Sequence, residues 1–220
     1  MKINLLVISL FLFFLSNAQI KKGTLYLGGD VQLYGSSYKS SAGMQYKRNT
    51  NNYNFSPSVG WVIKDNVIVG GRLLASFSSD KEEIPTSYEN EGNRIGAGIW
   101  MRSYLPLGKS FFLFADAGIN GQSIYLNQTN TQQPGSVYYE RGFAINAAIY
   151  PGLSYQVKKS LFIEAALINL ISLAYERKNT EQGNSNSSFL TGVSKSYSLS
   201  SSLGNGVPLQ IGVRWIIARK

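Results

Sequence analysis

The chain has 220 residues and a formal net charge of +9, with 21 Lys and Arg against 12 Asp and Glu. It contains neither histidine nor cysteine, which excludes disulfides, Ser-His catalysis and the usual transition-metal ligands. With a mean hydropathy of −0.09 and a single long apolar run at its start, the chain predicts no transmembrane helix in the body of the protein.

The first 18 residues have the pattern of a signal peptide. Lys2 supplies a positive start, Leu5–Leu15 is an apolar run, and small residues precede Gln19 at the positions that a signal peptidase reads. The run is too short to span about 30 Å of hydrocarbon. We therefore expect residues 1–18 to be removed and residues 19–220 to form one exported domain.

From residue 25 onward, apolar and polar residues alternate with the period of two that is typical of β-strands. In the first segment Leu25, Leu27 and Leu33 share one face, and Tyr26 and Asp30 share the other. The seventh segment is nearly continuously apolar, which predicts a bulge or an apolar patch inside a barrel. The expected strands are Leu25–Tyr34, Tyr53–Lys64, Val67–Ser78, Arg94–Leu105, Phe111–Asn120, Gly142–Tyr155, a seventh around Ala165–Leu173, and Leu209–Ile217.

The connections differ in length at the two ends of these strands. Three are short turns, at Lys64–Asn66, Pro106–Ser110 and Gln156–Ser160. Four are long, polar and expected to be loops: Ser36–Asn52, Ser79–Gly92, Asn127–Tyr138 and Glu176–Gly206. This asymmetry predicts an all-β fold, an eight-stranded antiparallel up-and-down transmembrane β-barrel with both chain ends at the short-turn end.

The outward face of such a barrel would contact lipid. It is predicted to include Leu25, Val31, Val59, Val69, Ile99, Leu113, Ile145 and Val213. Aromatic residues lie near both ends of the strands on this face, as in the two aromatic girdles of membrane barrels. They are Trp61, Phe111, Tyr155 and Trp215 at the short-turn end and Tyr53, Phe55 and Phe77 at the other.

The positive charge is concentrated at the short-turn end, which we call the basic collar. The long-loop end carries equal numbers of basic and acidic residues, so the chain has no basic groove of the kind that binds nucleic acid. The collar has a net charge of +7 and consists of Lys21, Lys22, Lys64, Lys109, Lys158, Lys159, Arg219 and Lys220, opposed by Asp65.

Two groups of residues are predicted to point into the barrel. The first is a charge network in which buried cations and carboxylates neutralise one another: Asp30, Arg72, Arg94, Arg102, Asp116, Glu164 and Arg214. The second is an aromatic plug toward the short-turn end: Tyr26, Trp100, Tyr104, Phe112, Phe114 and Phe162. An acid/base pair of Asp116 and Glu164 is the competing interpretation of the charges. The acidic stretch Asp80–Glu83 lacks the ligand spacing of a calcium site, and no catalytic, cofactor-binding or metal site is expected.

Three stretches resemble barrel hairpins of a known family: Ser56–Leu73, Arg102–Ile119 and Pro151–Leu167. They are similar to the small outer-membrane β-barrel proteins of Gram-negative bacteria, the outer membrane protein beta-barrel domain group with OmpA/OmpX-like barrels. The resemblance implies a hairpin architecture rather than an activity. The chain departs from the family in ending on Ile217-Ala218-Arg219-Lys220 instead of an aromatic residue, although Trp215 lies nearby.

Together these features predict a non-enzymatic, monomeric outer-membrane protein whose partners are membrane lipid and an unidentified extracellular molecule contacted by the loops, with no nucleic acid and no cofactor. Its role would be structural or surface-interactive. Two alternatives stay open at this point. One is a narrow porin-like channel for small solutes or ions. The other is a soluble, secreted, lipocalin-like barrel, which a polar inner face and an apolar outer face disfavour.

Overall fold

The computed structural model describes residues 20–40, 46–83, 88–130, 136–167, 170–184, 190–201 and 209–217. The predicted signal peptide and the collar residues Arg219 and Lys220 lie outside these ranges. The described residues form strands and short turns only. No helix in these ranges is long and apolar enough to cross a membrane.

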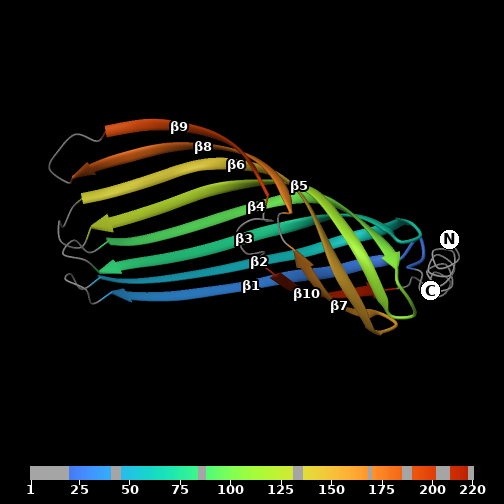
Figure 1. Cartoon of the computed structure of the whole chain (residues 1–220). Helices are drawn as coiled ribbons and strands as arrows, with labels where there is room; N and C mark the ends of the chain where they lie inside the picture. Colours follow the sequence, from blue (N-terminus) through green and yellow to red (C-terminus); the bar gives the residue numbers. More distant parts are fainter. Residues whose placement is uncertain are drawn as a thin grey trace, which may run out of the picture.

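Ten strands build one antiparallel sheet (Figure 1). They are β1 (Leu25–Ser40), β2 (Tyr46–Lys64), β3 (Val67–Glu83), β4 (Tyr88–Pro106), β5 (Phe111–Asn130), β6 (Ser136–Lys158), β7 (Leu161–Leu167), β8 (Ile171–Asn184), β9 (Leu190–Ser200) and β10 (Leu209–Ile217). Because β7 and β8 both pair with β6, and β10 and β9 pair with β7 and β8 respectively, these four are the halves of two interrupted strands. The predicted eight-stranded antiparallel barrel is thereby confirmed.

The barrel closes where β10 pairs with β1, from Leu25↔Ile217 to Asp30↔Gly212. Following paired residues once around the ring from Ser172 leads to Ile216, whose N–H donates to the carbonyl of Ser160 at 2.8 Å. Ser160 lies twelve residues before Ser172 on the same interrupted strand. One turn around the ring therefore shifts the pairing by twelve residues, or roughly 40 Å along the strand, while the circumference of eight strands is roughly 38 Å. This ratio corresponds to a strand tilt of about 45°, as closed eight-stranded barrels require.

The short turns are confirmed at the closed end of the barrel. In the two-residue turn between β2 and β3, Asn66 adopts a φ of 64°, a left-handed conformation that asparagine tolerates better than most residues. Asn66 also binds the segment before β1, since its side chain accepts from the N–H of Ile20 and its own N–H donates to the Ile20 carbonyl, both at 2.9 Å.

The expectation of four long loops was wrong. The strand pairs continue as hairpins through most of these segments: β1 and β2 pair out to Ser40↔Tyr46, and β8 and β9 pair out to Gln182↔Leu190. The polar composition was misleading because hydrogen-bonded strands outside an apolar environment are also polar, and cross-strand pairs stabilise them. One such pair is Arg48 with Asp80, at 2.5 Å.

Two of the prolines within strands, Pro57 and Pro151, lie beside irregularities in the strand pairing. Pro57 pairs with Gly29 on β1, but the pairing of β2 with β3 skips Ser56 and Pro57. Pro151 pairs with Ala115 on β5, and beside it the partner of β6 changes from β7 at Gly152↔Ala166 to β8 at Ile149↔Ile171. Proline has no N–H to donate to a ladder. The register of pairing with β6 shifts by two residues between β7 and β8, which agrees with the irregularity expected in the seventh strand.

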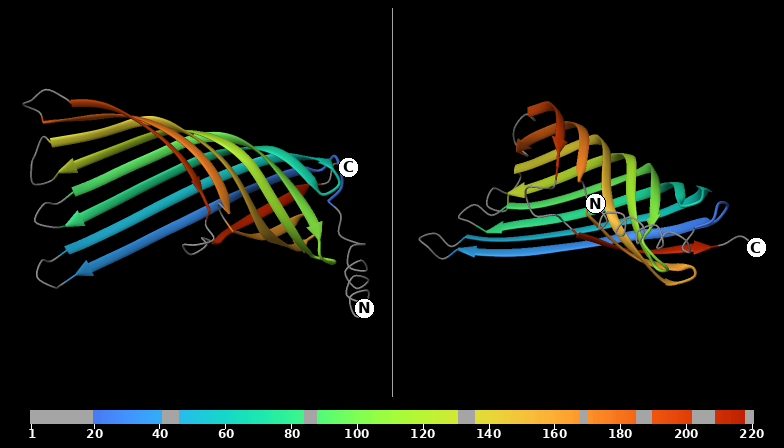
Figure 2. Two further views of the ribbon diagram at one scale, coloured as in Figure 1. Left: turned by 45° about the horizontal axis from the view of Figure 1, so that its top comes forward. Right: turned by 45° about the vertical axis from the view of Figure 1, so that its right-hand side comes forward.

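The alternation of faces is also as predicted. Val31, Ile99 and Ile145 expose 53%, 68% and 47% of their surface, whereas the intervening side chains are buried or point toward the lumen. Figure 2 shows the resulting shape: a closed tube at the end with the short turns, which opens into a broad curved sheet at the end with the long hairpins.

Small residues that point into the barrel leave space for large side chains. Gly70 is one of them, and it faces the indole of Trp100. A Cβ atom on Gly70 would lie 2.8 Å from the Trp100 indole and in conflict with the Val59 carbonyl. On the neighbouring Gly71, which points outward, the nearest atom would be 3.8 Å away.

We predict that Gly70→Ala lowers the free energy of unfolding by about 1–3 kcal/mol, the range for overpacked interiors. Gly71→Ala should change it by less than about 0.5 kcal/mol. Urea unfolding in lipid vesicles measures both, and equal effects would contradict the inward packing of Trp100.

Candidate functional site

The inside of the closed end holds a continuous chain of alternating charges. Asp30 pairs with Arg214, which lies 3.0 Å from Glu164. Glu164 and Asp116 both pair with Arg102, at 2.5 and 2.8 Å. Asp116 then pairs with Arg72 at 2.8 Å. Three arginines and three carboxylates thus alternate without a break, and their charges cancel.

Arg102 is the centre of this chain. Its side chain is 3% exposed, and its guanidinium donates to Asp116, Glu164 and the hydroxyls of Tyr26 and Tyr104. Its guanidinium carbon also lies 4.3 Å from the centre of the Phe114 ring. Such a buried charge is stable only when its hydrogen-bonding capacity is used, and here carboxylates and hydroxyls use it.

The network connects strands that are distant in sequence. Its members come from β1, β3, β4, β5, β7 and β10. Arg72 adds β6 by donating to the Tyr150 hydroxyl at 3.2 Å. Seven of the eight strands of the ring are thus joined across the lumen by side chains, in addition to their backbone ladders.

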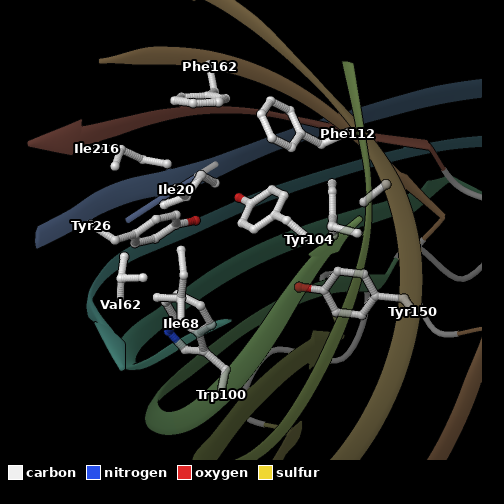
Figure 3. Close-up of a cluster of buried hydrophobic side chains, with 12 residues drawn as sticks. Ile20, Tyr26, Val62, Ile68, Trp100, Tyr104, Phe112, Tyr150, Phe162 and Ile216 are labelled. Atoms are coloured by element: carbon white, nitrogen blue, oxygen red, sulfur yellow. The ribbon is translucent and has the colours of Figure 1, made fainter. Parts of the chain in front are cut away.

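The six predicted plug residues are all buried in one cluster at the closed end (Figure 3). Their rings contact one another: the ring centres of Tyr26 and Trp100 are 4.9 Å apart, and those of Phe112 and Phe162 are 5.7 Å apart. Tyr104 links this cluster to the charges, because its hydroxyl donates to Glu164 at 2.5 Å. The plug and the charge chain therefore form one packed interior.

The sequence reasoning misplaced one residue and missed several. Arg94 does not join the chain; it lies further along the lumen, 3.8 Å from Glu176, with a half-exposed side chain. The cluster also contains Tyr150, Val62, Ile68, Ile216, Ala166 and Ile20. All but Ile20 occupy inward positions of the two-residue alternation, so the pattern could have identified them. Ile20 precedes the first strand, and no signal marks it.

A second polar cluster lies in the outer half of the lumen. Lys178 binds Glu140 at 3.1 Å and Glu176 at 2.6 Å, and Tyr138 donates to Glu140 at 2.6 Å. On the hairpin of β2 and β3, hydrogen bonds from Arg48 and Thr50 lower the pKa of the Asp80 carboxyl. These charges are again paired within the protein.

The described part of the basic collar surrounds the closed end. Lys64, Lys109, Lys158 and Lys159 are exposed in or beside the three short turns. Asp65 is partly engaged, since it accepts a hydrogen bond from the N–H of Lys22 at 2.9 Å. The collar is thus a solvated rim around a filled tube.

This arrangement supports structural pairing over chemistry. Asp116 and Glu164, the one candidate acid/base pair, are both saturated by arginines and 1% and 2% exposed. Within the described residues, no group of three or more acidic side chains is placed to hold a metal ion. Comparisons with protein-family models and with curated proteins give no match for this chain.

We predict that Arg102→Ala destabilises the barrel by about 3–5 kcal/mol, because it leaves Asp116 and Glu164 buried without their shared partner. The matched control is Lys47→Ala, which breaks the exposed pair with Glu83 and should cost less than about 1 kcal/mol. Urea unfolding followed by tryptophan fluorescence measures both. Similar values for the two variants would show that the buried chain does not hold the interior together.

Proposed function

We propose that the protein is an integral outer-membrane β-barrel without enzymatic activity, whose hairpins at the open end act at the cell surface. The observation that carries this proposal is the character of its outer wall: the paired charges lie inside the barrel, and large apolar side chains cover the outside. Leu73, Ile99 and Ile211 are each more than 60% exposed. Water-soluble monomers rarely expose a contiguous apolar surface of this kind.

The apolar surface forms a belt with defined borders. On one side it ends at Leu33, Tyr53 and Phe77, which are paired across β1, β2 and β3. The next outward positions on these strands are Gly35, Asn51 and Ser79. The change from apolar to polar therefore occurs at one level on three strands, as at a membrane–water interface.

Aromatic rings mark both borders of the belt. At the border toward the hairpins, the ring centres of Phe143 and Tyr175 are 5.7 Å apart, and those of Tyr175 and Tyr197 are 4.9 Å apart. Phe111 and Tyr155 are 4.8 Å apart at the border toward the short turns. From Phe143 to Tyr155 on β6, twelve tilted residues span roughly 28 Å along the barrel axis. This agrees with the apolar band of about 25 Å in outer-membrane barrels.

The outer wall is also hollowed for apolar chains. A groove of about 540 Å³ crosses β3 to β8 and is lined by side chains such as Ile99, Ile119, Ala147, Ile149 and Leu173. Lipid acyl chains have the shape and polarity to fill it. The groove therefore supports contact of this face with a bilayer.

The orientation follows from the chain ends. The first and last described strands meet at the closed end, and single-chain bacterial barrels keep both ends in the periplasm. The basic collar would then face the periplasm and the long hairpins the outside. Cleavage of the Lys158–Lys159 turn by protease added to intact cells would contradict this orientation.

The alternative is a soluble, ligand-binding barrel. Gel mobility distinguishes it clearly from the proposed membrane barrel. A membrane barrel should need detergent for extraction, and unboiled and boiled samples should migrate differently on a denaturing gel. A protein that is soluble without detergent and shows one mobility would overturn the membrane assignment.

We predict that Val59→Arg and Leu113→Arg each destabilise the barrel in vesicles by about 2–4 kcal/mol, the cost of arginine near the middle of a lipid-facing wall. Asn51→Arg is the control, because Asn51 shares the outward face of β2 with Val59 but lies beyond the belt. It should cost no more than about 1 kcal/mol. If all three variants unfold at the same urea concentration as the parent, the proposed belt is wrong.

We predict that the refolded protein gives no stable conductance steps in planar bilayers. A water path would require the charge chain to open and Tyr104, Phe112 and Phe114 to move, and breaking one buried pair costs about 3–5 kcal/mol. Gly118, which faces Arg72 and Trp100 inside the lumen, provides the control. Reproducible single-channel steps that a bulky substitution at Gly118 removes would favour the porin-like alternative.

A further inference from the structure

Three basic side chains lie together on the outer wall, on the neighbouring strands β6, β8 and β9 (Figure 1). Arg141, Arg177 and Lys195 are exposed and occupy outward positions of the two-residue alternation. Arg177 pairs directly with Lys195 and with Phe143, and Arg141 is the next outward residue beyond Phe143 on β6. Directly paired side chains are about 5 Å apart and diagonal ones about 7–8 Å. We call Arg141, Arg177 and Lys195 the cation cluster.

The cation cluster lies directly beyond the aromatic border of the apolar belt. That border consists of Phe143, Tyr175 and Tyr197 on the same three strands, and the ring of Tyr175 contacts both of the others. On each strand, the next outward residue toward the hairpins is one of the three cations. Two residues along a tilted strand correspond to roughly 5 Å along the barrel axis. With the belt in a membrane, the cations therefore lie at the depth of lipid headgroups.

The opposite part of the wall lacks cations at this position. On β1 to β4, the first outward residue beyond the belt is uncharged: Gly35, Asn51, Ser79 and Asn93. The cation cluster is therefore a local feature of β6, β8 and β9, and it does not continue around the border.

Within the described residues, no carboxylate forms an ion pair with the cation cluster. The ion pairs in this half of the barrel use other cations, namely Lys47, Arg48, Lys81, Arg94 and Lys178. Arg141 instead lies over the Tyr125 ring, with 5.7 Å between the guanidinium carbon and the ring centre. The outward carboxylate of Glu181 is four residues beyond Arg177 on β8, or roughly 13 Å along the strand. Three positive charges are thus left to attract an anion from outside the protein.

A phosphate group is the anion that fits this arrangement best. Each guanidinium can bind two phosphate oxygens through parallel N–H donors, and a lysine adds a compact positive charge. A carboxylate has two oxygens, which one arginine already occupies. A phosphate monoester has three free oxygens and can therefore bind cations from three strands at once.

The wall below the cation cluster offers a path for acyl chains. The groove of about 540 Å³ in the outer wall is lined on this side by Ala147 of β6 and by Ile171 and Leu173 of β8. Leu173 is four residues from Arg177 on the same strand, and the ring of Tyr175 lies on the outward face between them. A phosphate in the cation cluster and an acyl chain in the groove can therefore belong to one molecule, which favours a lipid over a soluble anion.

We propose that the cation cluster binds the phosphate headgroup of an anionic membrane lipid, whose acyl chains pass the aromatic border and enter the groove. This proposal rests on the proposed membrane location of the belt. It gives the wall of β6, β8 and β9 a preferred lipid, whereas the opposite wall contacts lipids regardless of their charge.

The test compares photoactivatable phosphatidic acid with photoactivatable diacylglycerol, which carry the same acyl chains with and without a phosphate. Each is added to the refolded full chain in phosphatidylcholine vesicles, and labelled residues are mapped by mass spectrometry. At Phe143, Tyr175 and Tyr197 we expect about tenfold more labelling by phosphatidic acid, the effect of roughly 1.4 kcal/mol of selectivity. Leu33 and Tyr53 at the opposite border are the internal control and should be labelled equally by both lipids. Equal labelling at both borders, or the same phosphate preference at both, would overturn the site.

Two charge-matched double variants test the cation cluster itself. Arg141→Gln with Arg177→Gln leaves one cation of three, and the phosphate preference at the β6–β8–β9 border should fall from about tenfold to about twofold, one third of the original selectivity free energy. Lys47→Gln with Lys81→Gln removes the same charge from cations that are already paired with glutamates and should leave the preference unchanged. Equal loss in both double variants would show that net charge alone attracts the lipid and would overturn the site.

Two further readouts separate the lipid from other occupants and the site from the membrane location. Glycerol phosphate, which carries the same phosphate without acyl chains, should not compete at the concentration of the lipid. Full competition would assign the cation cluster to a soluble phosphate and overturn the lipid. Every sample is first checked for different gel mobility before and after boiling. Loss of that difference in the parent protein would overturn the membrane location, whereas its presence without a phosphate preference would overturn the lipid site alone.

Discussion

The rest of the structure depends on the pairing of β10 with β1. It turns a sheet into a ring and leaves no free strand edge in the closed half of the barrel, which is the only way for a sheet to exist in lipid. Closure with eight strands also fixes the width of the lumen, just enough for side chains to fill it. The composition of the interior follows from these two consequences.

Within that narrow lumen, charged residues can exist only as a balanced set. Arg102 satisfies two carboxylates and two tyrosines at once, and Arg72 and Arg214 extend the pairing on either side. These side chains therefore bind one another, and they are not available as an acid/base pair or as the lining of a pore. The proposed function therefore depends on the surfaces of the barrel, namely the belt and the hairpins.

Much of this could be predicted from the sequence because a strand has a strict two-residue period. The alternation of Leu25, Tyr26 and Leu27 decides which residues meet inside the barrel, and the charge balance of the inward residues then implies pairing. The partners could not be predicted: Arg94 and Arg102 both point inward, but only the stagger of the strands brings Arg102 beside Glu164 and places Arg94 beside Glu176. The hairpin extensions were missed for a related reason. Their outward residues, such as Asn51 and Ser79, are polar, and polarity alone does not distinguish a solvated strand from a loop.

The central claim, that the outer wall contacts lipid and the lumen does not, can be tested with the three tryptophans of the chain. Trp61 and Trp215 are 57% and 49% exposed on the outer wall, and Trp100 is 3% exposed inside. In variants that each retain one tryptophan, with phenylalanine at the other two positions, brominated lipids in the vesicle should quench the fluorescence of Trp61 and Trp215. The fluorescence of Trp100 should be unaffected. Quenching of Trp100 as strong as that of Trp61, or no quenching at any position, would contradict the account.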